Sequence, residues 1–406
     1  MSDVPGTVRI PFPIRAYNAL LNPLERPRIT VDSVEQYAIA KVGGGGLTAN
    51  ARRGLEALCG DAENSADLSA LGRYRMQVVM RDIAVNRLSV DKALADNPAL
   101  LDAPIERPVF ILGLPRSGTT ILFNVLAQDL AHRSPRTWEV DYPVPAPREE
   151  DYADGARIQR SQKVIDAFHR LAPSFNGIHP QGARLAEEDQ RVLAMNFSGC
   201  GFQHFVRAPG HQQRQFEHDG TESFRWHKRF LQFLETNVRR PRWLLKSPDD
   251  QLYLKAILDV YPDAMIIHTH RHPAEAIPSV GSLTYTVRRL FAKHCRPEDV
   301  GVDQMNFWGD ILNRCVSDRD ELGMEDHLVD VAFADLVKDP MQIVRRIYDR
   351  FSLQLDEKTV TRMQQFLEGN KRHTHGVHKY TLEQFGLNEA MLEERFGHYI
   401  ERFITA

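Results

Sequence analysis

The chain has 406 residues, in which 51 lysines and arginines nearly balance 54 aspartates and glutamates, for a formal net charge of −3. This length allows about two or three structural modules, and the near-neutral balance gives no general attraction to nucleic acid or to an anionic membrane. The four cysteines form no CxxC motif, the N-terminus lacks the apolar core of a signal peptide, and no run of about 18 apolar residues could cross a bilayer. The composition therefore predicts a large cytoplasmic protein without a membrane span.

The first 105 residues predict helices and carry no evident chemistry. Residues 34–42 form a short amphipathic stretch that Thr30 or Asp32 can cap, and four glycines at 43–46 end it. No strand precedes these glycines, so we interpret them as a linker rather than a phosphate cradle. Residues 68–94 have apolar side chains near helical spacing. We therefore expect residues 1–105 to form a helical extension that packs on a catalytic domain of residues 106–406.

A strand, a glycine-bounded loop and a helix N-terminus follow one another from residue 109. The apolar residues 109–112 lead into Gly113-Leu-Pro-Arg-Ser-Gly-Thr-Thr120, an arrangement that holds phosphate on backbone N–H groups at the positive end of a helix. The spacing matches a Walker A loop, but Thr119 stands where ATP- and GTP-using enzymes keep a lysine. The loop therefore predicts a nucleotide without a triphosphate, and Arg116 supplies a cation suited to phosphate or sulfate oxygens.

From Arg107 onward, strand and helix patterns alternate, which is typical of an α/β fold with a mainly parallel sheet. The predicted strands are residues 109–112, 242–245, 265–268 and 328–331. Ligands of such sheets bind at the carboxyl ends of the strands. We therefore expect the motifs at Gly113, Lys246 and Arg271 to converge at one edge.

The region of residues 143–240, which includes a helical pattern at 156–171, is the least regular and is interpreted as the acceptor-binding insertion. Its aromatic residues either line a pocket for a largely apolar alcohol or phenol or pack helix faces, the reading that near-helical spacing favours. They are Phe197, Phe202, Phe205, Phe216, Phe224, Trp226, Phe230 and Phe233.

Several segments resemble the sulfotransferases that use 3′-phosphoadenosine-5′-phosphosulfate (PAPS), and are most similar to the bacterial-type branch of that superfamily. The matching segments are Pro115-Arg-Ser-Gly-Thr-Thr120, Trp243-Leu-Leu-Lys-Ser-Pro248, Ile266-Ile-His-Thr-His-Arg-His-Pro273 with Ser279, Asp335-Leu-Val-Lys-Asp-Pro340 and residues 378–387. They occur in the family's order across roughly residues 70–406. The resemblance implies a P-loop-like three-layer fold and transfer of the PAPS sulfuryl group to a hydroxyl of a small acceptor.

The resemblance also implies roles for individual residues. Arg271 and Ser279 have the spacing of the family's 3′-phosphate site, over which Lys371 and Arg372 would close. Arg116 and the loop N–H groups would hold the 5′-phosphosulfate, and Lys246 would lie near the transferred group. The loop residues concerned are Ser117, Gly118, Thr119 and Thr120.

Sulfuryl transfer is an in-line displacement, so the protein mostly positions the reactants and stabilises charge on the leaving oxygen. No metal is required by this scheme. The acceptor hydroxyl must lose a proton, and the competing general bases are Glu188, Asp250 and His179. Relatives of this branch often carry a histidine where Asp250 stands, so we favour Glu188.

Other readings stay open from the sequence. A small-molecule kinase would have the same strand, loop and helix, although Thr119 counts against it. A catalytically silent protein that binds the desulfated nucleotide is a second alternative. His268 and His270 alternate on a strand as zinc ligands can, but no nearby residue in sequence completes a site, which favours a structural role. The acceptor's identity and the oligomeric state are not determined.

Overall fold

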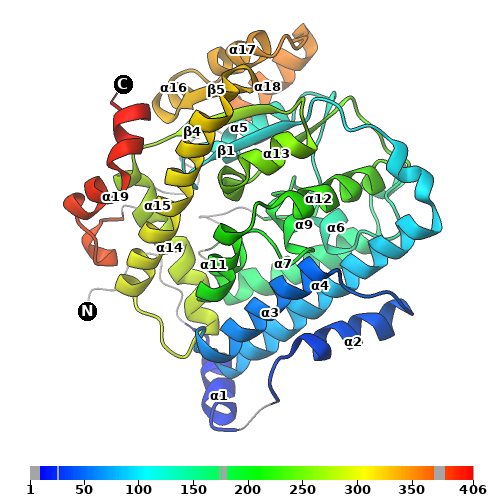
Figure 1. The fold of residues 1–406 in the computed structure, drawn as a ribbon, viewed down its shortest axis with the longest axis vertical. Coiled ribbons are helices and arrows are strands. Elements are labelled where there is room, and N and C mark those ends of the chain that lie inside the picture. Colours follow the sequence, from blue (N-terminus) through cyan, green and yellow to red (C-terminus); the bar gives the residue numbers. More distant parts are fainter. Residues whose placement is uncertain (1–9, 25–26, 173–174, 176–180, 370–379, 406) are drawn as a thin grey trace.

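The computed structural model describes residues 10–24, 27–172, 175, 181–369 and 380–405. Within these residues a five-stranded sheet has the strand order β2-β3-β1-β4-β5, and all its pairings are parallel (Figure 1). The predicted α/β fold with a mainly parallel sheet is therefore confirmed. The strands are β1 (Val109–Gly113), β2 (His132–Arg133), β3 (Arg242–Lys246), β4 (Met265–His270) and β5 (Leu328–Ala332).

Side chains of β1 alternate between the two faces of the sheet, as a period of two requires. Phe110 and Leu112 belong to one hydrophobic core, and Val109 and Ile111 to another. Both faces are therefore covered by helices, and the sheet is the middle of three layers.

The first core is packed by helices that precede or follow β3 and β4, together with the C-terminal helix. They are α9 (Gln190–Ala194), α12 (Thr221–Leu234), α13 (Leu254–Val260), α14 (Pro273–Phe291), α15 (Pro297–Leu322) and α19 (Glu389–Phe403). The second core is packed by α5 (Thr119–Leu126), α16 (Phe333–Lys338), α17 (Pro340–Arg350) and α18 (Glu357–Gly369).

Within the described residues, the region between β2 and β3 also contains further helices, and 3₁₀ turns occur there and elsewhere in the chain. The helices are α6 (Thr137–Asp141), α7 (Ala156–Leu171), α10 (Phe202–Phe205) and α11 (Pro209–Glu217). The 3₁₀ turns are η1 (Pro98–Asp102), η2 (Glu149–Tyr152), η3 (Pro248–Leu252), η4 (Met324–His327) and η5 (Glu383–Phe385).

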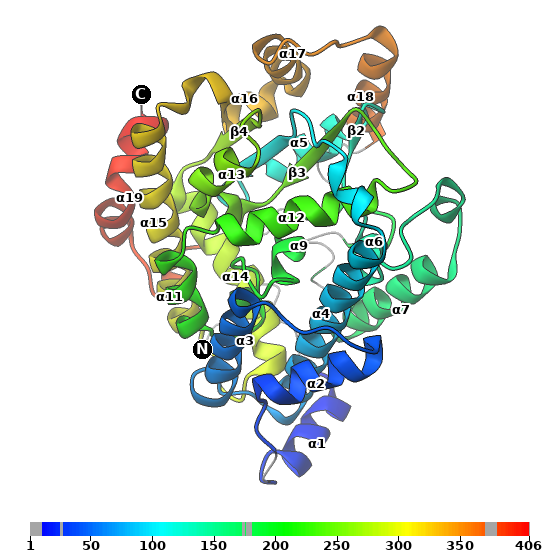
Figure 2. The ribbon, with the colours of Figure 1, turned by 45° about the vertical axis from the view of Figure 1, so that its right-hand side comes forward.

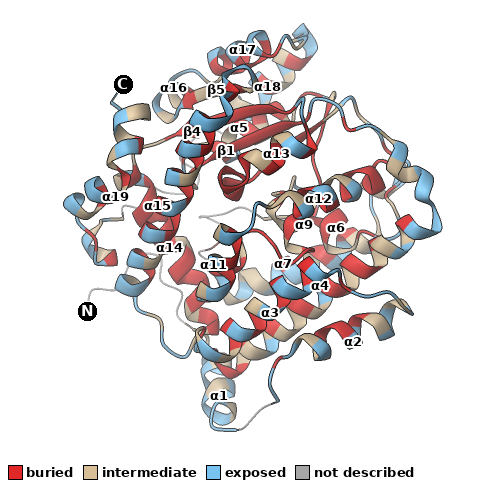
Figure 3. Cartoon of the chain, in the orientation of Figure 1, coloured by how far each residue is buried: buried red, intermediate tan, exposed pale blue. Residues whose placement is uncertain are grey.

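The N-terminal residues are helical, as expected, and lie at the end of the molecule away from β5 and α16–α18 (Figures 1 and 2). Their buried faces form a further core that includes Phe197 and Phe202 from the later part of the chain (Figure 3). Thr30 caps the second helix by accepting a hydrogen bond from the Ser33 N–H. The helices are α1 (Phe12–Leu21), α2 (Val31–Val42), α3 (Ala49–Asn64) and α4 (Ala70–Asp96). None of the helices in the described ranges is both long and apolar enough to span a bilayer.

The four predicted strands are present, each one or two residues longer than expected, whereas β2 was not predicted. Its two residues are His132 and Arg133, so no apolar run marks it. It pairs with β3 at Arg242 and Trp243.

Candidate functional site

The phosphate loop is shaped by two glycines in conformations that other residues rarely adopt. Gly113 has φ 141°, and a Cβ there would lie 2.2 Å from the Thr269 hydroxyl oxygen. Gly118 has φ 93°, and a Cβ there would lie 2.7 Å from Cδ2 of Leu336 in α16. Both positions thus require glycine for backbone conformation and for space.

The loop ends at the N-terminus of α5, where Gly118 is the N-cap and Thr119 and Thr120 are the first helical residues. Helix geometry leaves such N–H groups without intrahelical partners, so they are available to an anion. Ser117 differs from them, because its N–H and its hydroxyl both bond to the Leu114 carbonyl oxygen, at 3.1 and 2.6 Å. Ser117 therefore stabilises this conformation of the loop through its own hydrogen bonds.

Arg116, Arg271 and Ser279 are brought together although they are far apart in sequence. Nε of Arg116 donates to the Ser279 hydroxyl at 3.1 Å, and Nη1 of Arg271 donates to the Arg116 carbonyl oxygen at 2.7 Å. Arg271 also stacks over the Phe333 ring at 4.2 Å and pairs with Glu275 at 2.9 Å. Two guanidinium groups beside a helix N-terminus make a site for a multiply charged anion.

Lys246 and Glu188 form an ion pair next to this loop. Lys246 ends β3, and its register with Ile111 sets it beside the strand that leads into the loop. Its Nζ contacts Oε1 of Glu188, and both side chains are largely buried, with 3% and 13% exposed. Gln190 donates to the other carboxylate oxygen of Glu188. A proton acceptor and a cation therefore lie side by side at the carboxyl end of the sheet.

Three further carboxyl groups, those of Asp189, Asp249 and Asp250, lie buried behind that pair. Burial raises the pKa of Asp189 and of Asp249 to about 7. Burial, and then the charge of the neighbouring Asp189, raises the pKa of Asp250 well above its ordinary value. Burial thus favours the protonated form of Asp250, which favours a structural role for this residue over proton exchange with an acceptor.

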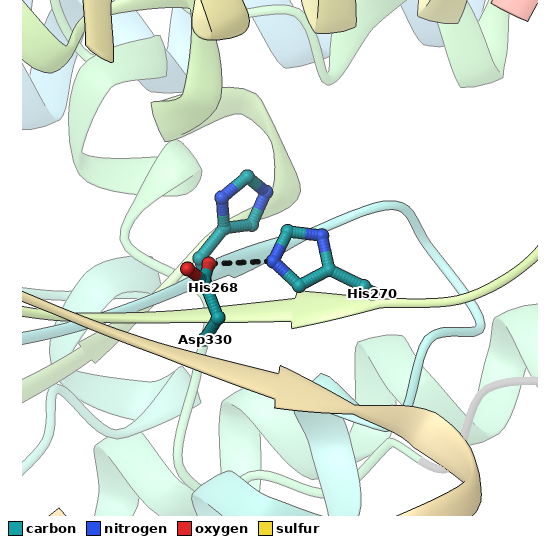
Figure 4. Close-up of side chains that lie close together, drawn as sticks. All are labelled: His268, His270 and Asp330. Atoms are coloured by element: carbon teal, nitrogen blue, oxygen red, sulfur yellow. Dashed lines mark hydrogen bonds and ion pairs between the residues drawn. The ribbon is translucent and has the colours of Figure 1, made fainter. Parts of the chain in front are cut away.

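His268 and His270 lie on one side of β4, and β5 brings Asp330 next to them (Figure 4). The three could offer metal ligands within 4.8 Å of one another. However, Nη1 of Arg319 contacts Oδ1 of Asp330 at 2.7 Å and Nδ1 of His268 at 3.2 Å, so a cationic group is already there. Nε2 of His268 donates to Gln251 at 3.0 Å. These bonds favour the structural reading of the histidine pair.

The same network reaches the anion site through the C-terminal helix. His270 donates through Nε2 to Asp330 at 2.7 Å, and its Nδ1 accepts from the Tyr399 hydroxyl at 3.1 Å. The Tyr399 oxygen accepts a hydrogen bond from the backbone N–H of Arg271. Burial lowers the pKa of His270, which keeps the ring neutral and this pattern of donors fixed. Asp330, Arg319 and Tyr399 were missed because no local motif marks them.

The remaining predicted residues either are not described or, for the most part, pack in the cores. His179, Lys371 and Arg372 lie outside the described residues. Most of the aromatic group is buried in the cores, which favours helix packing, while Phe205 is 50% exposed and Phe216 is partly buried. The buried members are Phe197, Phe202, Phe224, Trp226, Phe230 and Phe233.

The fold and this site define a P-loop-like α/β protein whose phosphate loop lacks the lysine of triphosphate-binding loops. A model of the sulfotransferase family matches residues 108–357, which is more than half of the chain. The chain therefore belongs to the sulfotransferase family and is a sulfotransferase enzyme, as the sequence motifs predicted. This assignment sets aside the kinase and the catalytically silent alternatives.

Mycobacterial sulfotransferases are among its relatives. Omega-hydroxy-beta-dihydromenaquinone-9 sulfotransferase Stf3 of Mycobacterium bovis is 26% identical over 307 residues, which cover 73% of this chain and 74% of that protein. The crystal structure of sulfotransferase STF1 from Mycobacterium tuberculosis H37Rv matches with a TM-score of 0.81 and 28% identity, over 92% of this chain and 100% of that one. That of STF9 from Mycobacterium avium has a TM-score of 0.83 and 27% identity, over 94% and 98%.

Proposed function

We propose that the enzyme transfers the sulfuryl group of PAPS to a hydroxyl of a small, partly apolar acceptor by in-line displacement. The observation that carries this proposal is the meeting of Arg116, Arg271 and Ser279 beside the Lys246–Glu188 pair. PAPS carries a 3′-phosphate and a 5′-phosphosulfate, so it needs two anion sites and a cation near the sulfur. The residues fit both needs.

Each group has a distinct role in this scheme. Arg271 and Ser279 bind the 3′-phosphate, with Lys371 and Arg372 as further candidates. The N–H groups of Gly118, Thr119 and Thr120 hold the 5′-phosphosulfate.

Negative charge builds on the bridging oxygen as the bond to sulfur breaks, and Arg116 and Lys246 stabilise it. Glu188 takes the proton of the acceptor hydroxyl as that oxygen attacks the sulfur. Glu188 is positioned for this role by its ion pair with Lys246.

The acceptor proposal follows the relative Stf3, whose name identifies a hydroxylated dihydromenaquinone as its acceptor. We extend this to the present chain as a class only, namely a hydroxyl carried by a lipophilic molecule. We also propose that the reaction takes place in the cytoplasm.

Nucleotide binding tests whether PAPS is the sulfuryl donor. The desulfated product, 3′-phosphoadenosine-5′-phosphate (PAP), should raise the melting temperature without magnesium, and adenosine 5′-phosphate should do so far less. Arg271→Ala should lose about 1.5–3 kcal/mol of affinity for PAP, the range for hydrogen bonds to charged groups, and little for the nucleotide without the 3′-phosphate. Arg225→Ala, whose surface ion pair with Asp259 is 3.3 Å long, serves as the control. If Arg271→Ala weakened the binding of both nucleotides equally, Arg271 would have another role. If magnesium ATP stabilised the wild type as much as PAP does, PAPS would be contradicted as the donor.

A further inference from the structure

Helix α1 is turned so that polar residues face the protein. The side-chain oxygens of Asn18 and Asn22 accept hydrogen bonds from the N–H groups of Leu71 and Ala70, at 3.0 and 2.7 Å. Those N–H groups belong to the first turn of α4 and have no partner within their own helix. The two asparagines are four residues apart and so lie on one face. They fix the rotation of α1 about its axis.

The opposite face of α1 is apolar and exposed. Successive helical residues turn by about 100°, so Leu20 lies opposite the asparagines, with Ala16 beside it and Phe12 on the flank of the same surface. Phe12 is 72% exposed and Leu20 is 73% exposed, and Tyr17 and Leu24 extend the same surface with 40% and 58%. The only charged residue between positions 10 and 24 is Arg15. Surface helices of globular proteins normally show the reverse pattern.

We propose that this face of α1 docks on a lipid membrane. The apolar side chains of this stripe can enter lipid, while the tyrosine and the arginine at its border suit the headgroup region. The four exposed side chains together offer on the order of 400–500 Å², about half of the roughly 800 Å² per partner of a stable protein interface. A lipid surface is therefore favoured over a second copy of the chain.

Helix α1 is connected to the donor site through two other helices, and the relevance of this connection to catalysis rests on the proposed function. The Ser69 N–H, at the start of α4, donates to the carbonyl oxygen of Phe291 at 2.8 Å. Phe291 ends α14, the helix that carries Ser279. Twelve residues of helix separate the two, which is about 18 Å at 1.5 Å per residue. The docking face at α1 is therefore linked to the donor site through α4 and α14, although that site lies toward α16, where Arg271 stacks over Phe333.

Vesicle co-sedimentation of the full chain tests the docking without any turnover. The probe is vesicles of phosphatidylcholine and phosphatidylglycerol in equal amounts. We expect the wild type to sediment with them, and Phe12→Ser/Leu20→Ser to partition at least about tenfold less, since each lost side chain removes one exposed apolar contact. Leu130→Ser is the matched control, because Leu130 is 68% exposed but follows α5, at the other end of the molecule (Figures 1 and 2). It should bind as the wild type does.

The variants should keep the wild-type melting temperature and its rise with PAP, because both replaced side chains are exposed. A failure of vesicle binding is thereby separated from a failure of the proposed donor. Docking through the apolar face is overturned if the wild type does not sediment or if the double variant sediments equally. It is also overturned if high salt releases most of the protein, because the binding would then be electrostatic and not apolar. It is also overturned if sedimentation equilibrium finds a dimer that the double variant abolishes while vesicles bind neither.

Discussion

Lys246 is the residue at which binding and chemistry can best be separated. Its ammonium lies at the end of β3, beside Glu188 and the phosphate loop. Charge on the leaving oxygen is greatest in the transition state, so Lys246→Ala should lower turnover far more than it weakens binding of PAP. Comparing kcat with the dissociation constant of PAP measures the difference. Lys255→Ala removes a surface ion pair of 2.6 Å with Glu321 and should change neither quantity. Unchanged turnover in Lys246→Ala would remove this lysine from the catalytic groups.

Glu188 is the base that we favour, and its replacement gives a prediction that depends on the acceptor. Glu188→Gln should lower turnover by about 10²–10⁴-fold with an aliphatic alcohol, the usual contribution of a general base. The loss should shrink with an acidic phenol, which is already partly ionised. Glu187→Gln is the control, because Glu187 is the adjacent residue but pairs with Arg191 at 2.8 Å. A loss that is the same for all acceptors would mean that Glu188 positions the substrate, and no loss would pass the role to another base.

Asp250 should influence stability through its pairing with Asp189. The pKa of Asp189 is about 7 in the folded protein, against about 4 when unfolded, because of burial. The folded state therefore binds more protons than the unfolded state, and the free energy of unfolding falls as pH rises from about 4 through 7. Asp250→Asn removes a second buried carboxyl group whose pKa is raised on folding, so this fall should become shallower.

Urea unfolding midpoints measured from about pH 5 to pH 8 check the prediction for Asp250→Asn. Asp326→Asn is the control, because its carboxylate is fully exposed, and its pH dependence should match the wild type. A fall that is equally steep in Asp250→Asn would show that Asp250 takes up no proton on folding.

Among the elements, the loop between β1 and α5 depends most on a single backbone conformation. Gly118→Ala would force a Cβ against Leu336 and a side chain into φ 93°, so we expect a loss of about 1–3 kcal/mol in stability and weaker PAP binding. Gly60→Ala is the matched control: Gly60 lies within α3 with no neighbouring atom within 4 Å, and alanine there should be neutral or stabilise by up to about 1 kcal/mol. Melting curves with and without PAP measure both effects. Tight PAP binding by Gly118→Ala would show that the loop tolerates a shift.

The strands and the phosphate loop could be predicted because their signals are local. Apolar runs mark β1, β3, β4 and β5, and glycines at fixed spacing mark the loop. The strand β2 has no such run, and the partners of His268 come from β5 and α15, which sequence distance hides. The acid pair is hidden for the same reason, since Asp189 and Asp250 look like ordinary solvated carboxylates until the fold buries them. The features that depend on contacts between distant parts of the sequence could therefore not be predicted.

At the scale of the whole molecule, α3 and α4 are bound closely to the later part of the chain. A Cβ on Gly54 of α3 would lie 2.3 Å from the Phe197 carbonyl oxygen, and one on Gly72 of α4 would lie 2.0 Å from that of Phe291. The Trp226 indole donates to Asp91 of α4 at 2.9 Å. The division into residues 1–105 and 106–406 stays a prediction, but these contacts favour two segments that depend on each other for stability.

This dependence predicts a single cooperative unfolding transition. All four tryptophans follow residue 105, whereas α1–α4 contribute much of the helical signal. Tryptophan fluorescence and far-ultraviolet circular dichroism should therefore give the same urea midpoint. Gly54→Ala should lower both midpoints equally, because its Cβ strikes backbone at Phe197 and cannot be relieved by a side-chain rotation. Gly60→Ala, in the same helix but in open space, should not lower them. Separate transitions, or a Gly54→Ala change confined to circular dichroism, would mean that the N-terminal helices fold on their own and merely rest on the sheet-containing part.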